Sequence, residues 1–114
     1  MAGSTSTDTG IAAVAHIVAF ATSFLGPLIM YFLLDEGFAK RNAANALNWQ
    51  IMVIIYSTAI GAVGFLTLPL FGIGLFVLAL IPIVLLLDLI FCAVAALKAS
   101  NGEAWTYPIT YNFV

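Results

Sequence analysis

Three long apolar stretches constrain the fold of this chain more than any other feature. They cover residues 11–34, about 43–68 and about 74–97, and Asp88 is the one formally charged residue within them. Each is long enough to cross a bilayer as a helix, since about 20 residues suffice. We therefore expect an all-α, polytopic membrane protein with three transmembrane helices.

The composition excludes several other classes of protein. Hydrophobic residues make up 64% of the chain, and its charged residues are three Lys or Arg and five Asp or Glu. This leaves too little polar material for the surface of a small soluble domain. Three basic residues are too few to neutralise a nucleic-acid backbone. The single Cys92 excludes a disulfide scaffold. The expected partner is a lipid bilayer.

The polar ends of the chain flank one membrane domain. Residues 1–10 are small and polar, lack the basic start of a signal peptide, and are expected to form a disordered tail. Residues 11–114 form the single helical membrane domain. Within it, residues 98–114 are too polar to span and are expected at the membrane interface, with Trp105 and Tyr107 among the headgroups.

Prolines interrupt two of the three spans. Pro27, which follows Gly26, lacks an N–H and clashes with the carbonyl of Ser23, so a kink or break is expected in the first span. The second half of that span could then be a fourth, re-entrant segment. Pro82 predicts a similar kink in the third span.

The basic residues predict the orientation. With three spans, Lys40, Arg41 and Lys98 all fall on one side of the membrane. The positive-inside rule assigns that side to the cytoplasm. We expect a multi-pass protein of the cell membrane, with its N-terminus outside and its C-terminus cytoplasmic.

Asp88 is the sharpest functional signal, because a carboxylate near the middle of a span is costly when it faces lipid. It begins an i, i+4 stripe with Cys92, Ala96 and Ser100, which would let another helix approach closely. Asp88 could contact an ion, a proton or a substrate, or it could hold helices together through hydrogen bonds. The absence of a basic partner in the spans favours the second interpretation.

His16 is the second polar candidate inside a span. It could relay protons or pair with an acid, or it could be a neutral imidazole hydrogen-bonded to a neighbouring helix, which we favour. The chain has no second histidine and no cysteine at ligand spacing, so the sequence predicts no metal site, no other cofactor and no catalytic residue.

Four amide side chains open the second span. Asn42, Asn45 and Asn48 lie near one helical face, and Gln50 points about 200° away from Asn48. They could line a hydrophilic groove or form a docking surface for a partner. They could equally cap the helix and bond to neighbouring helices.

Several short segments resemble a known family in their order along the chain. They are Ala15-His16, residues 25–29 with Tyr31, residues 43–50 (AANALNWQ), residues 95–99, and Gly102-Glu103 followed by Tyr107-Pro108. This pattern resembles a family of small prokaryotic membrane proteins of unknown function, related to the Tic-twenty subunit of the chloroplast inner-envelope protein translocon. Members carry a histidine at the start of the asparagine-rich helix, where this chain has Arg41-Asn42.

The resemblance implies a compact multi-span fold without a reaction of its own. We expect a non-enzymatic membrane protein, resembling Tic-twenty-like proteins, that serves as a small subunit or as an assembly or translocation-related factor of a membrane complex. Its partners would be other membrane protein subunits or further copies of itself. The alternative is an oligomeric channel or transporter-like protein with a polar path that involves Asp88, His16 and the asparagine face.

Overall fold

The computed structural model describes residues 6–114 and shows an all-helical protein. Its helices are α1 (Ser6–Thr22), α2 (Leu25–Leu33), α3 (Phe38–Thr67), α4 (Ile73–Leu78) and α5 (Leu80–Ser100). A C-terminal segment, residues 101–114, follows without regular secondary structure. No strand occurs between residues 6 and 114, so the expected all-α class is confirmed for this part of the chain.

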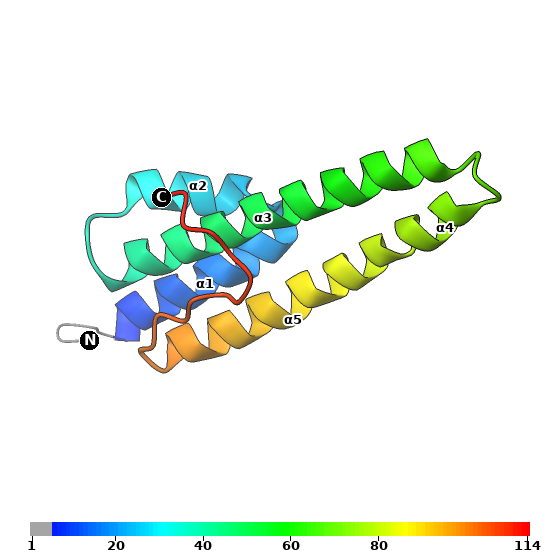
Figure 1. The fold of residues 1–114 in the computed structure, drawn as a ribbon. Coiled ribbons are helices and arrows are strands. Elements are labelled where there is room, and N and C mark those ends of the chain that lie inside the picture. Colours follow the sequence, from blue (N-terminus) through cyan, green and yellow to red (C-terminus); the bar gives the residue numbers. More distant parts are fainter. Residues whose placement is uncertain (1–5) are drawn as a thin grey trace.

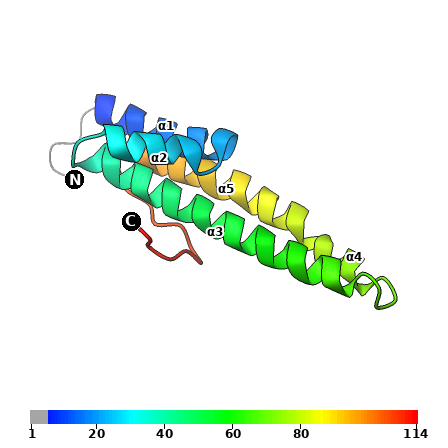
Figure 2. The ribbon, with the colours of Figure 1, turned by 90° about the horizontal axis from the view of Figure 1, so that it is seen from above.

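The molecule is elongated, with extents of 57 × 22 × 20 Å. Helix α3 runs antiparallel to α4 and α5, while α1 and α2 cover only one half of this pair (Figure 1). We call the uncovered part, residues 57–83, the arm, and the remainder of the described chain the base. The C-terminal segment crosses the base on the side away from α1 and α2 (Figure 2).

The first predicted span is not one continuous helix. α1 begins at Ser6, so residues 6–10 of the expected tail are helical, while residues 1–5 lie outside the described residues. The chain breaks at Ser23, whose φ is +59°, and α2 folds back along α1 (Figures 1 and 2).

The physical reason for this break lies in two neighbouring residues. Pro27 sits in the first turn of α2, where a backbone N–H would have no helical partner. Gly26 packs against Val18 so closely that an added Cβ would overlap the valine side chain. The break therefore becomes a reversal rather than a kink, and the three-span count is not confirmed.

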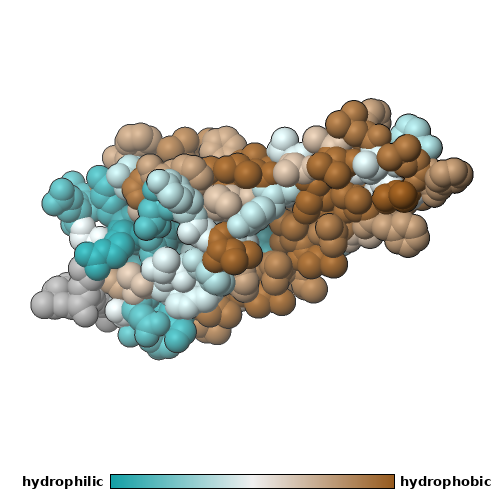
Figure 3. Space-filling model, in the orientation of Figure 1, coloured by the Kyte–Doolittle hydropathy of each residue, from teal (hydrophilic) through white to brown (hydrophobic). Residues whose placement is uncertain are grey.

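Two of the predicted spans match long apolar helical stretches. Phe38–Thr67 and Ile73–Ser100 are long and apolar enough to cross a membrane, judged by length and composition. The second stretch is interrupted at Ala79, between α4 and α5. This break precedes Pro82, whose missing N–H leaves the carbonyl of Leu78 without its helical donor. Apolar side chains dominate the surface towards the tip of the arm (Figure 3).

Small residues set the spacing of the helices. Ala12, Ala15 and Ala19 of α1 are completely buried, and α1 contacts both α3 and α5. In the arm, Gly64 and Gly74 bring α3 and α4 into backbone contact, because an added Cβ at Gly74 would overlap the carbonyl oxygen of Gly64. Close approach through small residues is typical of helix pairs in membranes.

A first prediction concerns this glycine contact. Gly74→Ala should lower the free energy of unfolding by about 1–3 kcal/mol, because the added methyl group meets backbone atoms that cannot move aside. Gly61→Ala is the matched control, since a Cβ there meets no atom within 4 Å. Loss of helical circular dichroism during SDS titration of the detergent-solubilised protein measures both. Equal stability of the two variants would contradict the packing described for the arm.

Candidate functional site

The base encloses a network of polar side chains between α1, α3, α5 and the C-terminal segment. We call it the buried polar network. Its members are His16, Asn42, Trp49, Gln50, Asp88, Cys92 and Tyr107, all buried. Buried polar groups are costly unless they are hydrogen-bonded, so these partners account for their presence.

Asp88 joins α5 to α3. Its Oδ1 accepts hydrogen bonds from Trp49 Nε1 at 2.9 Å and from Gln50 Nε2 at 2.7 Å. The Cys92 thiol, one turn further along α5, donates to the same oxygen at 3.3 Å. Trp49 and Gln50 therefore turn towards α5.

His16 joins α1 to α3 and to the C-terminal segment. Its Nε2 lies 2.9 Å from Asn42 Oδ1, and its Nδ1 lies 2.5 Å from the Tyr107 hydroxyl. Asn42 Nδ2 donates to the carbonyl of Phe38 at 3.0 Å, which leaves Oδ1 as the acceptor for His16. A neutral imidazole with its proton on Nε2, accepting from Tyr107 at Nδ1, satisfies both bonds.

Tyr107 connects the two halves of the network. Its hydroxyl oxygen lies 3.9 Å from the Cys92 sulfur, and its ring stacks on Trp49 with centroids 5.4 Å apart and an interplanar angle of 11°. Burial, with further contributions from Cys92 and Asp88, raises the pKa of Tyr107 above its ordinary value. The hydroxyl therefore stays protonated and can donate to His16. His16 and Asp88 do not pair directly.

The asparagine face docks the chain's own C-terminal segment. Asn45 Nδ2 donates to the carbonyl of Trp105 at 3.1 Å, and Asn48 Oδ1 accepts from the backbone N–H groups of Phe113 and Val114 at 2.8 and 3.0 Å. These bonds satisfy backbone groups that lack a helix or a sheet. These bonds lie within the chain, so they resemble the expected packing contacts more than a groove or a docking surface for a partner.

The C-terminal segment differs from the expected interfacial tail. Tyr107 is only 2% exposed and points into the base rather than towards headgroups, and Trp105 is half-buried against it. The physical reason is that Tyr107 packs in the core cluster with Trp49 and Cys92 and bonds His16 through its hydroxyl, while Trp105 packs against this cluster.

A second prediction follows from the two bonds to Asn48. Asn48→Ala should speed amide hydrogen exchange at Phe113 and Val114 by roughly two- to tenfold, since each lost hydrogen bond contributes about 0.5–1.5 kcal/mol. Asn48→Asp keeps an acceptor oxygen and should protect both amides. Hydrogen exchange measured by mass spectrometry on the C-terminal peptide tests this. Equal exchange in the two variants would show that Asn48 does not hold the segment.

The remaining charged side chains lie at the outer end of the base. Lys98 Nζ pairs with Glu103 at 3.4 Å, and Lys40 Nζ lies 4.8 Å from the centre of the Tyr31 ring. Asp35 and Glu36 are exposed in the loop between α2 and α3. This end of the molecule is the hydrophilic one (Figure 3).

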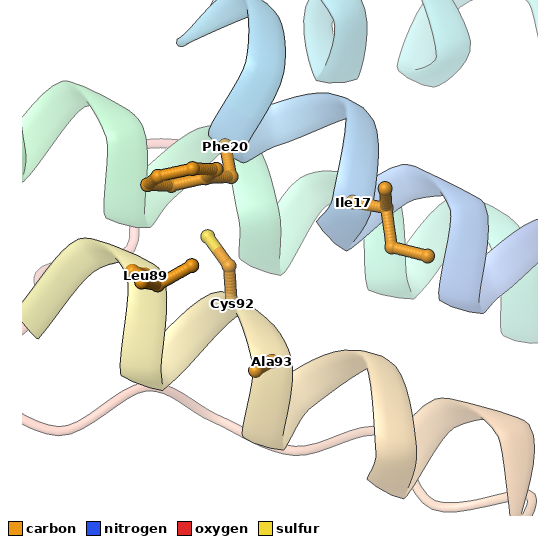
Figure 4. Close-up of a pocket in the computed structure, with 5 residues that line it drawn as sticks. All are labelled: Ile17, Phe20, Leu89, Cys92 and Ala93. Atoms are coloured by element: carbon orange, nitrogen blue, oxygen red, sulfur yellow. The ribbon is translucent and has the colours of Figure 1, made fainter.

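A shallow apolar cavity lies beside the network, between α1 and α5. Its lining residues are Ile17, Phe20, Leu89, Cys92 and Ala93 (Figure 4). The Cys92 sulfur points from α5 towards α1 in this view. Burial of the thiol and its bond to Asp88 leave the cavity without an accessible polar group, so it offers only hydrocarbon contacts.

The chemistry of the site is that of helix association. Between residues 6 and 114 no three His, Cys, Asp or Glu side chains gather closely enough to hold a metal ion. The carboxyl group of Asp88 accepts from the Cys92 thiol, His16 is bonded to Asn42 and Tyr107, and all three side chains are buried. The arrangement therefore fixes α1, α3, α5 and the C-terminal segment together.

The sequence did not predict that three residues, Trp49, Cys92 and Tyr107, belong to the buried polar network. Trp49 stands next to the amide cluster and Cys92 lies one turn from Asp88, so both had a local signal. Tyr107 had none, because its partner His16 is 91 residues away.

The apolar arm, the two long apolar helical stretches and the hydrophilic end define a small, all-helical, membrane-associated protein. The family model of the MamF/MmsF magnetosome magnetite crystal formation proteins matches residues 7–114. The chain therefore belongs to this magnetosome family. No curated protein and no solved structure matches it.

The family match corrects the expected identity. The resemblance to Tic-twenty-related proteins was wrong, and with it the translocon-related function and the alternative of a channel or transporter. The quoted motifs consist mostly of Ala, Gly, Pro and Asn, which pack and cap helices in many small membrane proteins. Such residues report helix contacts and do not distinguish one family from another.

Proposed function

We propose that this chain acts in magnetite crystal formation as a resident, non-catalytic protein of the magnetosome membrane. The match of residues 7–114 to the family carries the proposal, because it covers every described helix and the docked C-terminal segment. The buried polar network supports a non-catalytic role, since its titratable side chains are buried and hydrogen-bonded within the base.

The proposed membrane contact is the surface of the arm and the outer faces of α1 and α2. Large apolar side chains are exposed there, among them Phe20, Phe32, Phe65, Phe71 and Phe76. A soluble protein of this size rarely exposes such an extended apolar surface. We propose that lipid covers this surface, together with other membrane proteins or further copies of the chain. Nucleic acid is not a proposed partner.

We propose a topology that differs from three crossings. The start of α1, the loop between α2 and α3, and the C-terminal segment all lie at one end of the molecule (Figure 1). Only α3 and the α4–α5 stretch extend away from that end, so the start of α1 and the C-terminal segment belong on one side of the membrane. Lys40, Arg41 and Lys98 gather at the same end, which the positive-inside rule assigns to the cytoplasm.

A third prediction tests the function. Deleting the gene in a magnetite-forming bacterium should alter the number, size or shape of the crystals in electron micrographs, and the wild-type chain supplied in trans should restore them. A tagged chain should also purify with magnetosome membranes and resist carbonate extraction. Unaltered crystals in the deletion strain, or a chain released by carbonate, would contradict the proposal.

A further inference from the structure

We propose that the arm enters and leaves the bilayer from the same face, and that its tip, residues 67–73, stays in the hydrocarbon instead of emerging on the far side. This inference rests on the proposed membrane residence and specifies the partner of one surface, the acyl chains of the bilayer. Four independent features of the arm support it.

The first feature is the polarity of the arm. Residues 42–87 contain no Asp, Glu, Lys or Arg, and the polar side chains of residues 57–83 are only Ser57, Thr58 and Thr67. The tip carries Phe71, the most exposed large apolar side chain among the described residues, which is fully accessible. A loop that emerges into water has no need of such side chains, whereas a loop in lipid requires them.

The second feature is the hydrogen bonding of the tip. The N–H groups of Leu68, Leu70, Phe71, Gly72 and Ile73 all donate to carbonyl oxygens within residues 65–70, at 3.0–3.4 Å. Pro69 has no N–H, and the Thr67 hydroxyl donates to the carbonyl of Val63 at 2.7 Å. Backbone groups in a bilayer must be satisfied internally. The turn therefore presents no N–H donor between residues 68 and 73 that needs water.

The third feature is the placement of the aromatic belt. Both tryptophans and all four tyrosines of the chain lie at Tyr31, Trp49, Tyr56, Trp105, Tyr107 and Tyr111, all outside the arm. Trp and Tyr are enriched at both interfaces of a membrane-crossing protein. Trp49 and Tyr107 are buried in the core of the base. The other four aromatic side chains mark one interface only, at the base.

The fourth feature is length. The irregular C-terminal segment reaches the level of Tyr56, whose hydroxyl donates to the carbonyl of Ile109, and irregular backbone does not face hydrocarbon. From Tyr56 to Thr67, α3 rises only about 16 Å at 1.5 Å per residue. Measured from Val53, the last α3 residue in the core of the base, the rise is about 21 Å. Both lengths fall short of the roughly 30 Å hydrocarbon core.

The other faces of the molecule fit the same placement. Helices α1 and α2 expose Ile17, Phe20, Leu25 and Ile29. Both helices lie on the side of the base away from the C-terminal segment (Figure 2). An inclined molecule can rest these faces in the interface, bury the arm in the bilayer and turn the C-terminal segment towards water.

Cysteine labelling in native membranes tests the inference. Phe71→Cys and Leu70→Cys each place a thiol at the tip, and Thr106→Cys places one in the base. Each variant is made twice, once with Cys92 replaced by alanine and once with Cys92 retained. A membrane-impermeant maleimide is applied to right-side-out and to inverted vesicles. We expect the base thiol to react in one orientation, and the tip thiols to react in neither until detergent is added.

The contradicting results are specific. Reaction of a tip thiol in the vesicle orientation opposite to that of the base would show a full crossing. Reaction in the same orientation as the base would show that the tip lies outside the bilayer. Either result would overturn this inference and leave the crystal phenotype, and thus the proposed function, unaffected.

A depth measurement identifies what covers the tip. A fluorophore attached at Phe71→Cys in vesicles of phosphatidylcholine should be quenched most by nitroxides placed deep on the acyl chains, and one at Thr106→Cys by nitroxides at the headgroup. An unquenched tip would mean that protein, such as a second copy of the chain, covers it, and would overturn the assignment to lipid.

Discussion

Asp88→Ala is expected to lower the free energy of unfolding by about 2–6 kcal/mol, because each of two buried donors left without an acceptor costs about 1–3 kcal/mol. The donors are the indole N–H of Trp49 and the amide of Gln50, both almost completely buried and both bonded to Asp88 Oδ1. Their loss should loosen the contact between α3 and α5 in the base.

Asp88→Asn is the matched control. It keeps an oxygen at the position of Oδ1, so both donors retain an acceptor and most of the stability should remain. SDS titration followed by circular dichroism measures the global effect, and Trp49 fluorescence reports the local one. If alanine and asparagine lower stability equally, the carboxyl group does not hold α3 and α5 together in the way described.

Tyr107→Ala is expected to cost about 3–5 kcal/mol, the range for truncation of a buried aromatic side chain. It removes the ring that stacks on Trp49 and the hydroxyl that bonds His16. The C-terminal segment should then detach from the base and become sensitive to protease, while α3 and α4 stay paired in the arm through Gly64 and Gly74.

Two further variants separate the contributions of the ring and the hydroxyl. Tyr107→Phe keeps the stacked ring and leaves only His16 Nδ1 without a donor, so a loss of about 1–2 kcal/mol is expected. Tyr111→Ala removes a tyrosine of the same segment whose side chain is exposed, and should change stability by less than about 0.5 kcal/mol. In limited proteolysis and SDS titration, Tyr107→Ala should have the largest effect, Tyr107→Phe a smaller one and Tyr111→Ala the smallest. An effect of Tyr111→Ala as large as that of Tyr107→Ala would contradict the special position of Tyr107.

Much of the helical content follows from the sequence because it depends on local patterns. Long uncharged runs predicted the helices that became α3 and α4–α5, and Pro27 predicted an interruption in the first span. The direction of the chain after that interruption depends on how closely Gly26 approaches Val18. That contact belongs to tertiary packing, so the reversal of α2 was not predictable from the span pattern.

The candidate site was likewise predictable only in part. Asp88, His16, Asn45, Asn48 and Gln50 stand out in an apolar chain because a polar side chain in lipid needs a partner. Which partner each one finds depends on contacts between distant segments, as the pairing of His16 with Tyr107 illustrates. The family could not be identified from such physical patterns, because unrelated helical membrane proteins share the same packing residues.

Crystal size in magnetite-forming cells tests the central claim of a membrane-resident role in crystal formation most directly. The crystals are measured by electron microscopy in four versions of a deletion strain: without any copy of the gene, or with the wild-type chain, Asp88→Asn or Asp88→Ala supplied in trans. The amount of each protein is compared in isolated membranes. We predict that the wild-type chain and Asp88→Asn restore the crystals of the parent strain, while Asp88→Ala, with its loosened base, restores them less. Crystals of parental size and number in the strain without the gene would contradict the account.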